Sequence, residues 1–213
     1  MSKSKYVVTI TRQFGSMGRP IAKKMAARLG IEYYDRDIVD QAAAQLHLPA
    51  STINEEEERA RTQIKSRYIS MMFPFGGTHE SLLQKPNKDD TRDKIFEAQK
   101  DIIKFLAEKD TCVIVGRCAD FVLSDMPNLV NIYIYASYDA RLRHCIDDLG
   151  MEKDEAVRMI QSVDAARDDY HLRYAGYKPD DKRFKDIMID SSFLGVDGTA
   201  EYLADAIQKK FGQ

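Results

Sequence analysis

Short apolar runs rich in β-branched residues alternate with longer segments of helical periodicity along most of the chain. The apolar runs predict strands, and they cover residues 6–10, 31–35, 111–117, 128–137 and 186–192. The third and fourth runs are almost continuously apolar, which is typical of strands covered on both faces of a parallel sheet. Strands that alternate with helices in this way predict a three-layer α/β/α sandwich around a parallel sheet.

Helical periodicity fills the segments between these runs. Ile21, Met25 and Leu29 repeat at helical intervals, and Gly30 follows them as the expected C-terminal cap. Residues 73–90 are rich in Gly, Pro and Asn and predict a loop. Neither a repeat nor a linker divides the chain, so we expect one domain. Further helices are predicted at about 38–46, 54–72, 93–109, 137 or 139 to 150, 153–174 and 199–211.

The composition excludes several classes of protein. Hydrophobic residues make up 44% of the 213 residues and charged residues 31%, with a net charge of −2. This balance is typical of a soluble globular protein and argues against a nucleic-acid partner. No apolar run approaches the roughly 18 residues of a membrane span, and no signal peptide is evident. The three cysteines form no CxxC pair, and Cys and His lack metal-ligand spacing, so we expect reduced thiols in the cytoplasm.

A glycine-rich stretch, ITRQFGSMGRPIA at residues 10–22, connects the first predicted strand to the first helix. In a parallel sheet, such a turn brings backbone N–H groups and a helix N-terminus to a phosphate. The strict P-loop pattern is absent, because Gly18 stands at the Lys position when Gly15 takes the central position. Phosphate binding and a turn without a ligand are both open, and the nearby Arg12 and Arg19 favour phosphate.

Three further arginines follow predicted strands. Arg117 comes directly after the third strand, whose carboxyl end would face the same crevice as the glycine-rich loop. It is a candidate for a second phosphate site, and the alternative is a surface arginine paired with a carboxylate. Arg141 and Arg143 follow the fourth strand, where they would either line a nucleotide site or remain solvated.

Asp164, Arg167, His171 and Tyr174 form a polar stripe along one face of a predicted helix. Taken alone, such a stripe favours a solvated face. A lid helix that closes over phosphates would also need an arginine here, to neutralise the charge that develops during phosphoryl transfer. Both interpretations are open.

Four stretches of the chain together resemble the cytidylate kinase-like branch of the nucleoside monophosphate kinases, a group of P-loop kinases. They are residues 10–39, CVIVGRCADFVL, NIYIYASYDARLR and VDAARDDY. The resemblance implies a five-stranded parallel sheet in an α/β/α sandwich, with a helical monophosphate-binding insertion at about 51–92 and a lid at about 150–183. The core of the single domain would then comprise residues 1–50 and 93–213.

The reaction that the resemblance implies is transfer of the ATP γ-phosphoryl group to a nucleoside monophosphate in the presence of Mg²⁺, with CMP or dCMP as candidate acceptors. No metal ligand is assigned. We expect ATP to contact Arg12, Gly15, Ser16, Met17, Gly18, Arg19 and Arg141. We expect the acceptor at Asp35, Arg36, Arg117, Asp164 and Arg167, and the catalytic charges at Arg19, Arg117 and Arg167.

Two positions depart from the family pattern. Gly18 replaces the P-loop lysine, and Val115 replaces an acidic residue that precedes the Gly-Arg pair. Arg12 or Arg19 would have to supply the missing positive charge. Because phosphoryl transfer depends on positioning and charge neutralisation, the alternative function is a non-catalytic nucleotide- or anion-binding module. A scaffold protein that uses residues 54–90 is a third hypothesis.

An apolar and aromatic group in the predicted insertion has three possible uses: an acceptor pocket, a contact between the two copies of a homodimer, or core. The identity of the acceptor and the oligomeric state therefore stay open. The group comprises Tyr68, Met71, Met72, Phe73 and Phe75.

Overall fold

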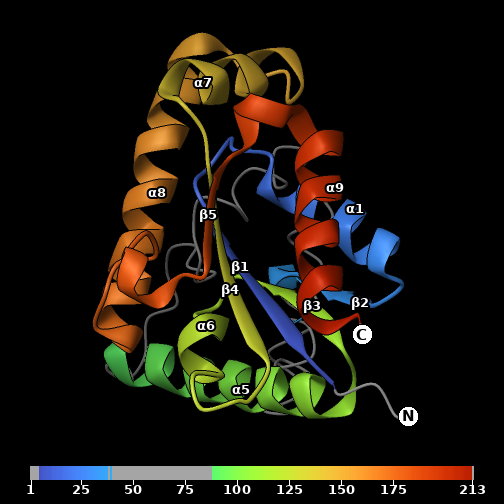
Figure 1. Ribbon diagram of the computed structural model, residues 1–213. Coiled ribbons are helices and arrows are strands. Elements are labelled where there is room, and N and C mark those ends of the chain that lie inside the picture. Colours follow the sequence, from blue (N-terminus) through green and yellow to red (C-terminus); the bar gives the residue numbers. More distant parts are fainter. Residues whose placement is uncertain (1–4, 38, 40–87, 213) are drawn as a thin grey trace, which may run out of the picture.

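Five parallel strands form one sheet in the order β2-β3-β1-β4-β5, as Figure 1 shows for this computed structural model. The structure describes residues 5–37, 39 and 88–212. The predicted α/β fold with a five-stranded parallel sheet is thereby confirmed. The strands are β1 (Val7–Arg12), β2 (Glu32–Tyr34), β3 (Cys112–Val115), β4 (Leu129–Tyr135) and β5 (Ile187–Asp190).

Strand β1 lies at the centre of the sheet, between β3 and β4. It pairs in register with β3 from Val7 to Ile10, and it continues along β4 as far as Arg12. The strand is therefore longer than the predicted run of residues 6–10. Strands β3 and β4 follow each other in the sequence but lie on opposite sides of β1. The carboxyl ends of these strands therefore border the crevice in which parallel sheets bind ligands.

Helices cover both faces of the sheet (Figure 1). On one face, α1 (Gly18–Leu29) and α9 (Ser191–Phe211) pack over a buried cluster that includes Val8 and Ile10 of β1. On the other face, α5 (Lys88–Lys109) and α6 (Ala119–Val122) pack over a cluster that includes Val7. Successive β1 side chains thus enter opposite layers, which explains why the strand is apolar throughout.

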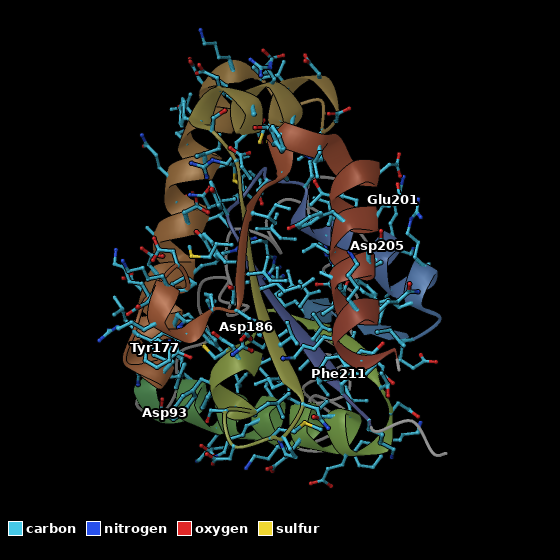
Figure 2. The ribbon with its side chains drawn as sticks, in the orientation of Figure 1. Asp93, Tyr177, Asp186, Glu201, Asp205 and Phe211 are labelled. Carbon is cyan, nitrogen blue, oxygen red and sulfur yellow. The ribbon has the colours of Figure 1, made fainter. Side chains whose placement is uncertain are left out.

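Helices α7 (Tyr138–Asp147) and α8 (Lys153–Ala175) pack together beside the carboxyl edge of the sheet. Ser137 caps α7 by accepting a hydrogen bond from the Ala140 N–H at 3.3 Å. At its far end α8 meets α5, where Asp93 accepts from the Tyr174 hydroxyl at 3.2 Å, and Figure 2 labels Asp93 at this junction. The Tyr174 ring also stacks on Phe96 at 3.9 Å. Helix α8 is therefore anchored at both ends.

Two helices begin earlier than the sequence pattern predicts. Helix α5 starts at Lys88, so residues 88–90, which were predicted as loop, are helical. Helix α9 starts at Ser191 because Asp190 caps it through the Ser192 N–H at 2.8 Å. Its first turn then breaks at Gly195, with φ 66° and ψ −174°. The kink explains why helical periodicity is evident only after it.

Other predictions fall outside the described residues. These are the helix at 54–72, most of the helix at 38–46 and of the loop at 73–90, and most of the insertion at 51–92. The short helix α6 and the turn η1 (Lys182–Phe184) were not predicted from the sequence. Within the part of the chain that the structure describes, no helix is long and apolar enough to cross a membrane.

Candidate functional site

The glycine-rich loop presents a run of backbone N–H groups at the carboxyl end of β1. Gly15 and Met17 adopt left-handed conformations, with φ 74° and 60°, and α1 begins at Gly18 without a side-chain cap. In the described part of the chain, the five N–H groups of residues 15–19 have no hydrogen-bond acceptor. Successive free N–H groups at a helix N-terminus are suited to binding an anion such as phosphate.

Hydrogen bonds of Ser16 hold this loop in place. The Ser16 hydroxyl lies within hydrogen-bond distance of the carbonyl oxygens of Gln13 and Ile134, at 2.9 and 3.1 Å. The Ser191 hydroxyl in turn donates to the Ser16 carbonyl at 2.7 Å. Ser16 was predicted to contact ATP. Because its buried hydroxyl faces backbone carbonyls, only its N–H is available for that contact.

Gly15 lies directly against α7. A Cβ atom at this position would lie 3.0 Å from the Arg141 carbonyl oxygen and 3.2 Å from the Cys145 sulfur. Together with its positive φ, this close approach requires glycine. The residue therefore allows the loop both to turn and to touch α7.

Asp164 of α8 ties the loop to the two neighbouring helices. One carboxylate oxygen accepts from the Phe14 N–H at 2.7 Å, and the other accepts from the Arg141 guanidinium. Arg141 also donates to the Phe14 carbonyl at 3.3 Å. Asp164 was predicted to bind the acceptor and Arg141 to bind ATP. In this structure both side chains hold the loop, and their contacts with ligands stay predictions.

Four arginines line a pocket near the loop, and we call it the arginine pocket. They are Arg12, Arg36, Arg117 and Arg167, and no carboxylate is among the described residues that line it. Burial and the nearby charges of Arg167, Arg19 and Arg36 lower the pKa of Arg12 well below its usual range. Burial, opposed by Asp164, lowers the pKa of Arg167 to about 10. Positive charges crowded in this way favour a bound anion.

Arg117 lies where the sequence predicted, immediately after β3. The residue is 7% exposed, so the surface interpretation is wrong. Gly116 and Arg117 both have positive φ values, 84° and 56°, and the guanidinium carbon lies 5.7 Å from the centre of the Tyr170 ring. A positive φ is uncommon for a residue other than glycine. Here Arg117, which has this strained conformation, lines the arginine pocket.

Arg19 is engaged outside the arginine pocket. Its guanidinium contacts Asp35 at 2.6 Å and Asp37 at 2.5 Å. Although burial opposes the effect, these two carboxylates raise the pKa of Arg19. The predicted acceptor residues thus separate: Arg36 lines the arginine pocket, whereas Asp35 pairs with Arg19.

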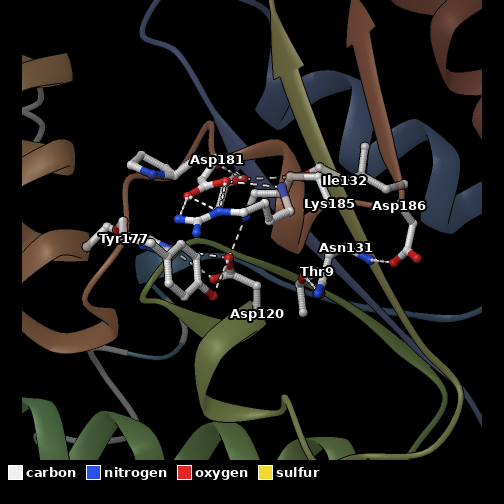
Figure 3. Close-up of polar contacts among 12 residues, drawn as sticks. Thr9, Asp120, Asn131, Ile132, Tyr177, Asp181, Lys185 and Asp186 are labelled. Atoms are coloured by element: carbon white, nitrogen blue, oxygen red, sulfur yellow. Dashed lines mark hydrogen bonds and ion pairs between the residues drawn. The ribbon is translucent and has the colours of Figure 1, made fainter.

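Behind the arginine pocket lies a buried polar cluster that the sequence analysis did not find. The Asp120 carboxylate accepts from Lys185 at 2.5 Å and from His171 Nε2 at 3.0 Å, and Figure 3 shows Lys185 and Tyr177 around it. His171 Nδ1 lies 2.8 Å from the Tyr177 carbonyl oxygen. Both ring nitrogens therefore face hydrogen-bond acceptors. The cluster joins α6, α8 and the segment before β5.

Asp120 remains ionised although it is buried. Burial alone would raise the pKa of Asp120, but the hydrogen bonds and charges of His171 and Lys185 outweigh burial and lower it to about 2. The signal in the sequence was a single carboxylate within the apolar stretch CVIVGRCADFVL. His171 is 3% exposed, so the solvated interpretation of the stripe on α8 is wrong for this residue.

A second hollow opens on the other side of the loop, between α7 and the start of α9. We call it the α7–α9 hollow. Arg143 lines it, whereas Arg141 is held against the loop. The described residues show no group of three or more His, Cys, Asp or Glu side chains that could hold a metal ion. The other residues at its wall include Gly15, Met17, His144, Ser192 and Val196.

The five-stranded parallel sheet and the loop between β1 and α1 have the architecture of the P-loop kinases. The chain belongs to the cytidylate kinase-like family, whose sequence profile matches residues 7–193. A search of curated protein sequences found no significant match.

Solved structures support the fold. An uncharacterized protein from Eubacterium ventriosum ATCC 27560 is 25% identical, with a TM-score of 0.65 over 98% of this chain and 99% of its own. TT1252 from Thermus thermophilus is 14% identical, with a TM-score of 0.53 over 98% of both chains. A shikimate kinase from Bacteroides thetaiotaomicron is 13% identical, with a TM-score of 0.50 over 99% of this chain and all of its own. At these last two identities the likeness concerns the fold alone.

Proposed function

We propose that the protein is an ATP-dependent phosphotransferase that moves the γ-phosphoryl group to a small acceptor carrying a phosphate. One observation carries the proposal: the five N–H groups of residues 15–19, which have no acceptor among the described residues, adjoin a pocket lined by four arginines and no described carboxylate. Phosphoryl transfer between two phosphate-bearing molecules requires two adjacent anion sites. Here one site would consist of backbone N–H groups and the other of arginine side chains.

The loop is the proposed donor site. The phosphates of ATP would accept hydrogen bonds from the N–H groups of residues 15–19, and the N-terminus of α1 adds its positive end. The α7–α9 hollow adjoins the loop through Gly15 and Met17, and it offers room for the rest of the nucleotide. Arg143 is the arginine of α7 that lines this hollow.

The arginine pocket is the proposed acceptor site. Arg36, Arg117 and Arg167 come from three different elements, so an anion there would be held from several directions. Family membership makes CMP and dCMP the first acceptors to test. The lid proposed for residues 150–183 would be α8 and the segment that follows it, because α8 carries Arg167.

The described residues do not fit a magnesium site built from protein ligands. Ser16 faces two carbonyls, Val115 replaces a carboxylate, and Asp35 pairs with Arg19. Mg²⁺ is therefore proposed only as the ion that accompanies ATP, held by phosphate oxygens and water. The protein itself orients the two substrates and offsets their negative charge.

The direct test is to incubate the full chain with Mg-ATP and a panel of nucleoside monophosphates. The expected result is formation of ADP together with a diphosphate product, dependent on one or a few acceptors. A folded protein that binds neither ATP nor any monophosphate, and produces no ADP across a broad panel, would refute the proposal.

The non-catalytic alternative rests on Gly18 and Val115, which lack the charges that the family pattern provides. Calorimetry separates it from the enzyme. A binding module would give a saturable heat with ATP but no product after prolonged incubation with every acceptor. An enzyme would give both the heat and the product.

A further inference from the structure

The side chain of Arg12 is enclosed by two glycines that lie far apart in the sequence. A Cβ atom at Gly18 would lie 2.8 Å from Arg12 Cβ and 2.9 Å from Arg12 Cγ. A Cβ atom at Gly116 would lie 2.6 Å from Arg12 Nη1. The side chain therefore starts at the end of β1, passes against the start of α1 and brings its guanidinium to the turn after β3. Both glycines leave the space that this path needs.

The guanidinium of Arg12 has no partner of opposite charge in the described part of the chain. Its side chain makes no hydrogen bond or ion pair there, whereas Arg19 binds two carboxylates. Its backbone carbonyl accepts a hydrogen bond from Arg167 at 3.0 Å. A partly buried cation without a partner is costly unless an anion binds to it.

We propose that Arg12 supplies the positive charge that the loop lacks at Gly18, by binding the terminal phosphate of ATP where the loop meets the arginine pocket. This inference rests on the proposed function and assigns the residue that links its two sites. Arg12 is the last residue of β1, just before the loop, and it also lines the arginine pocket. A guanidinium there would contact the phosphoryl group on its way from donor to acceptor.

The proposed step leaves the proton of Arg12 in place. The bond between the γ-phosphorus and its bridging oxygen breaks, and the electron pair stays with ADP. An oxygen of the acceptor phosphate forms the new bond to phosphorus. Arg12 donates hydrogen bonds to the transferring group throughout and offsets its negative charge, as cationic groups do in other phosphoryl transfers.

The same geometry gives a reason for the missing lysine. A lysine at position 18 would place its Cβ in the space that Arg12 occupies. The two arrangements therefore exclude each other: a cation rises either from the first turn of α1 or from the end of β1. Arg19 is a poorer source of this charge, because Asp35 and Asp37 already offset it.

The first experiment compares the wild-type chain with Arg12→Gln and Arg12→Lys. We expect Arg12→Gln to lower kcat by about 100- to 1000-fold, and to weaken the binding of ATP by calorimetry much more than that of AMP. Arg12→Lys should retain part of the activity. Arg28→Gln is the matched control, because Arg28 is an exposed arginine of α1 that pairs with Glu201, and it should behave like wild type.

The second experiment moves the charge. Gly18→Lys alone should lose activity because the new side chain displaces Arg12. Gly18→Ala should also displace Arg12 and lose activity, although it adds no charge. The double variant Arg12→Gly/Gly18→Lys removes the clash, because glycine at position 12 has neither the Cβ nor the Cγ that a Cβ at position 18 would meet. We expect it to exceed Arg12→Gly in kcat by at least about tenfold, since one cation is restored. Thermal unfolding checks that each variant is folded.

The outcomes separate the two proposals. Suppose that the wild-type chain is active and that folded Arg12→Gln keeps the full kcat and ATP affinity. That result would overturn the role of Arg12 but leave the proposed function intact. The role is likewise overturned if the folded double variant is no better than Arg12→Gly. Absence of both nucleotide binding and turnover in the wild-type chain would overturn the proposed function itself.

Discussion

The carboxylate of Asp164 accepts a hydrogen bond from the Phe14 N–H at 2.7 Å, which fixes the glycine-rich loop to helix α8. The other oxygen of the same carboxylate holds Arg141, whose side chain is only 10% exposed. One acidic group thus sets the position of the loop relative to both α7 and α8. The consequence is that loop geometry depends on a residue distant in the sequence.

Replacing Asp164 with Asn should destabilise the protein. The substitution keeps the size of the side chain but leaves the largely buried Arg141 without a counter-charge, and we expect a loss of about 2 kcal/mol in the free energy of unfolding. Urea denaturation provides the measurement. Asp168→Asn on the same helix is the control: it removes a more exposed pair with Lys178 and should cost less than about 1 kcal/mol. Equal losses in the two variants would contradict the role given to Asp164.

Stability should fall in acid as Asp120 becomes protonated. Its folded-state pKa of about 2 lies below the ordinary value of 3.8. The ionised carboxylate therefore stabilises the fold above pH 4, and the contribution disappears as the pH falls from about 4 to 2. The shift corresponds to about 2 kcal/mol.

The check is the difference in the free energy of unfolding between wild type and Asp120→Asn, measured across this pH range. Near neutral pH the variant should be less stable, by about 3–5 kcal/mol, because His171 and Lys185 lose their shared carboxylate. The difference should shrink towards pH 2. A difference that does not change with pH would show that the carboxylate is not ionised in the native protein.

Arg167 should act mainly on the acceptor. It lines the arginine pocket and extends from α8, so Arg167→Gln should raise the acceptor KM by at least about tenfold and lower kcat. The KM for ATP should change much less. Arg173→Gln, on the same helix but at the junction with Asp93, is the comparison and should leave both KM values close to wild type. A larger effect on ATP than on the acceptor would reverse the proposed assignment of the two sites.

Helix α8 should be protected when both substrates bind. If residues 150–183 act as a lid, ATP together with an acceptor should slow hydrogen exchange within residues 152–178, because closure reduces local opening. ATP alone should have a smaller effect. Exchange that stays the same under saturating concentrations of both ligands would contradict the lid.

Much of the fold could be predicted because its signals are local. The apolar runs identified all five described strands, and Gly30 terminates α1 with a positive φ of 64°. The position of Arg117 at the end of β3 also follows from the order of residues along the strand. Errors arose where tertiary contacts or caps outweigh periodicity, as at the kinked start of α9 near Gly195.

The candidate site could be predicted only in part. The sequence pointed to the loop and to the arginines near it. The contacts by which Asp164 and Arg141 hold the loop were not foreseen, nor was the contact of Lys185 with Asp120. The partner of a charged side chain is set by packing between elements. Sequence spacing within one helix or strand carries no information about it.

The sequence by itself determined the parallel α/β fold, the glycine-rich loop after the first strand and the absence of a lysine at position 18. These are properties of residue order, hydrophobic periodicity and glycine content. Only the tertiary structure decided which arginine beside that loop has no carboxylate partner among the described residues. Arg19 meets Asp35, whereas Arg12 lies between Gly18 and Gly116, because parallel strands bring the turns that follow them to one edge of the sheet.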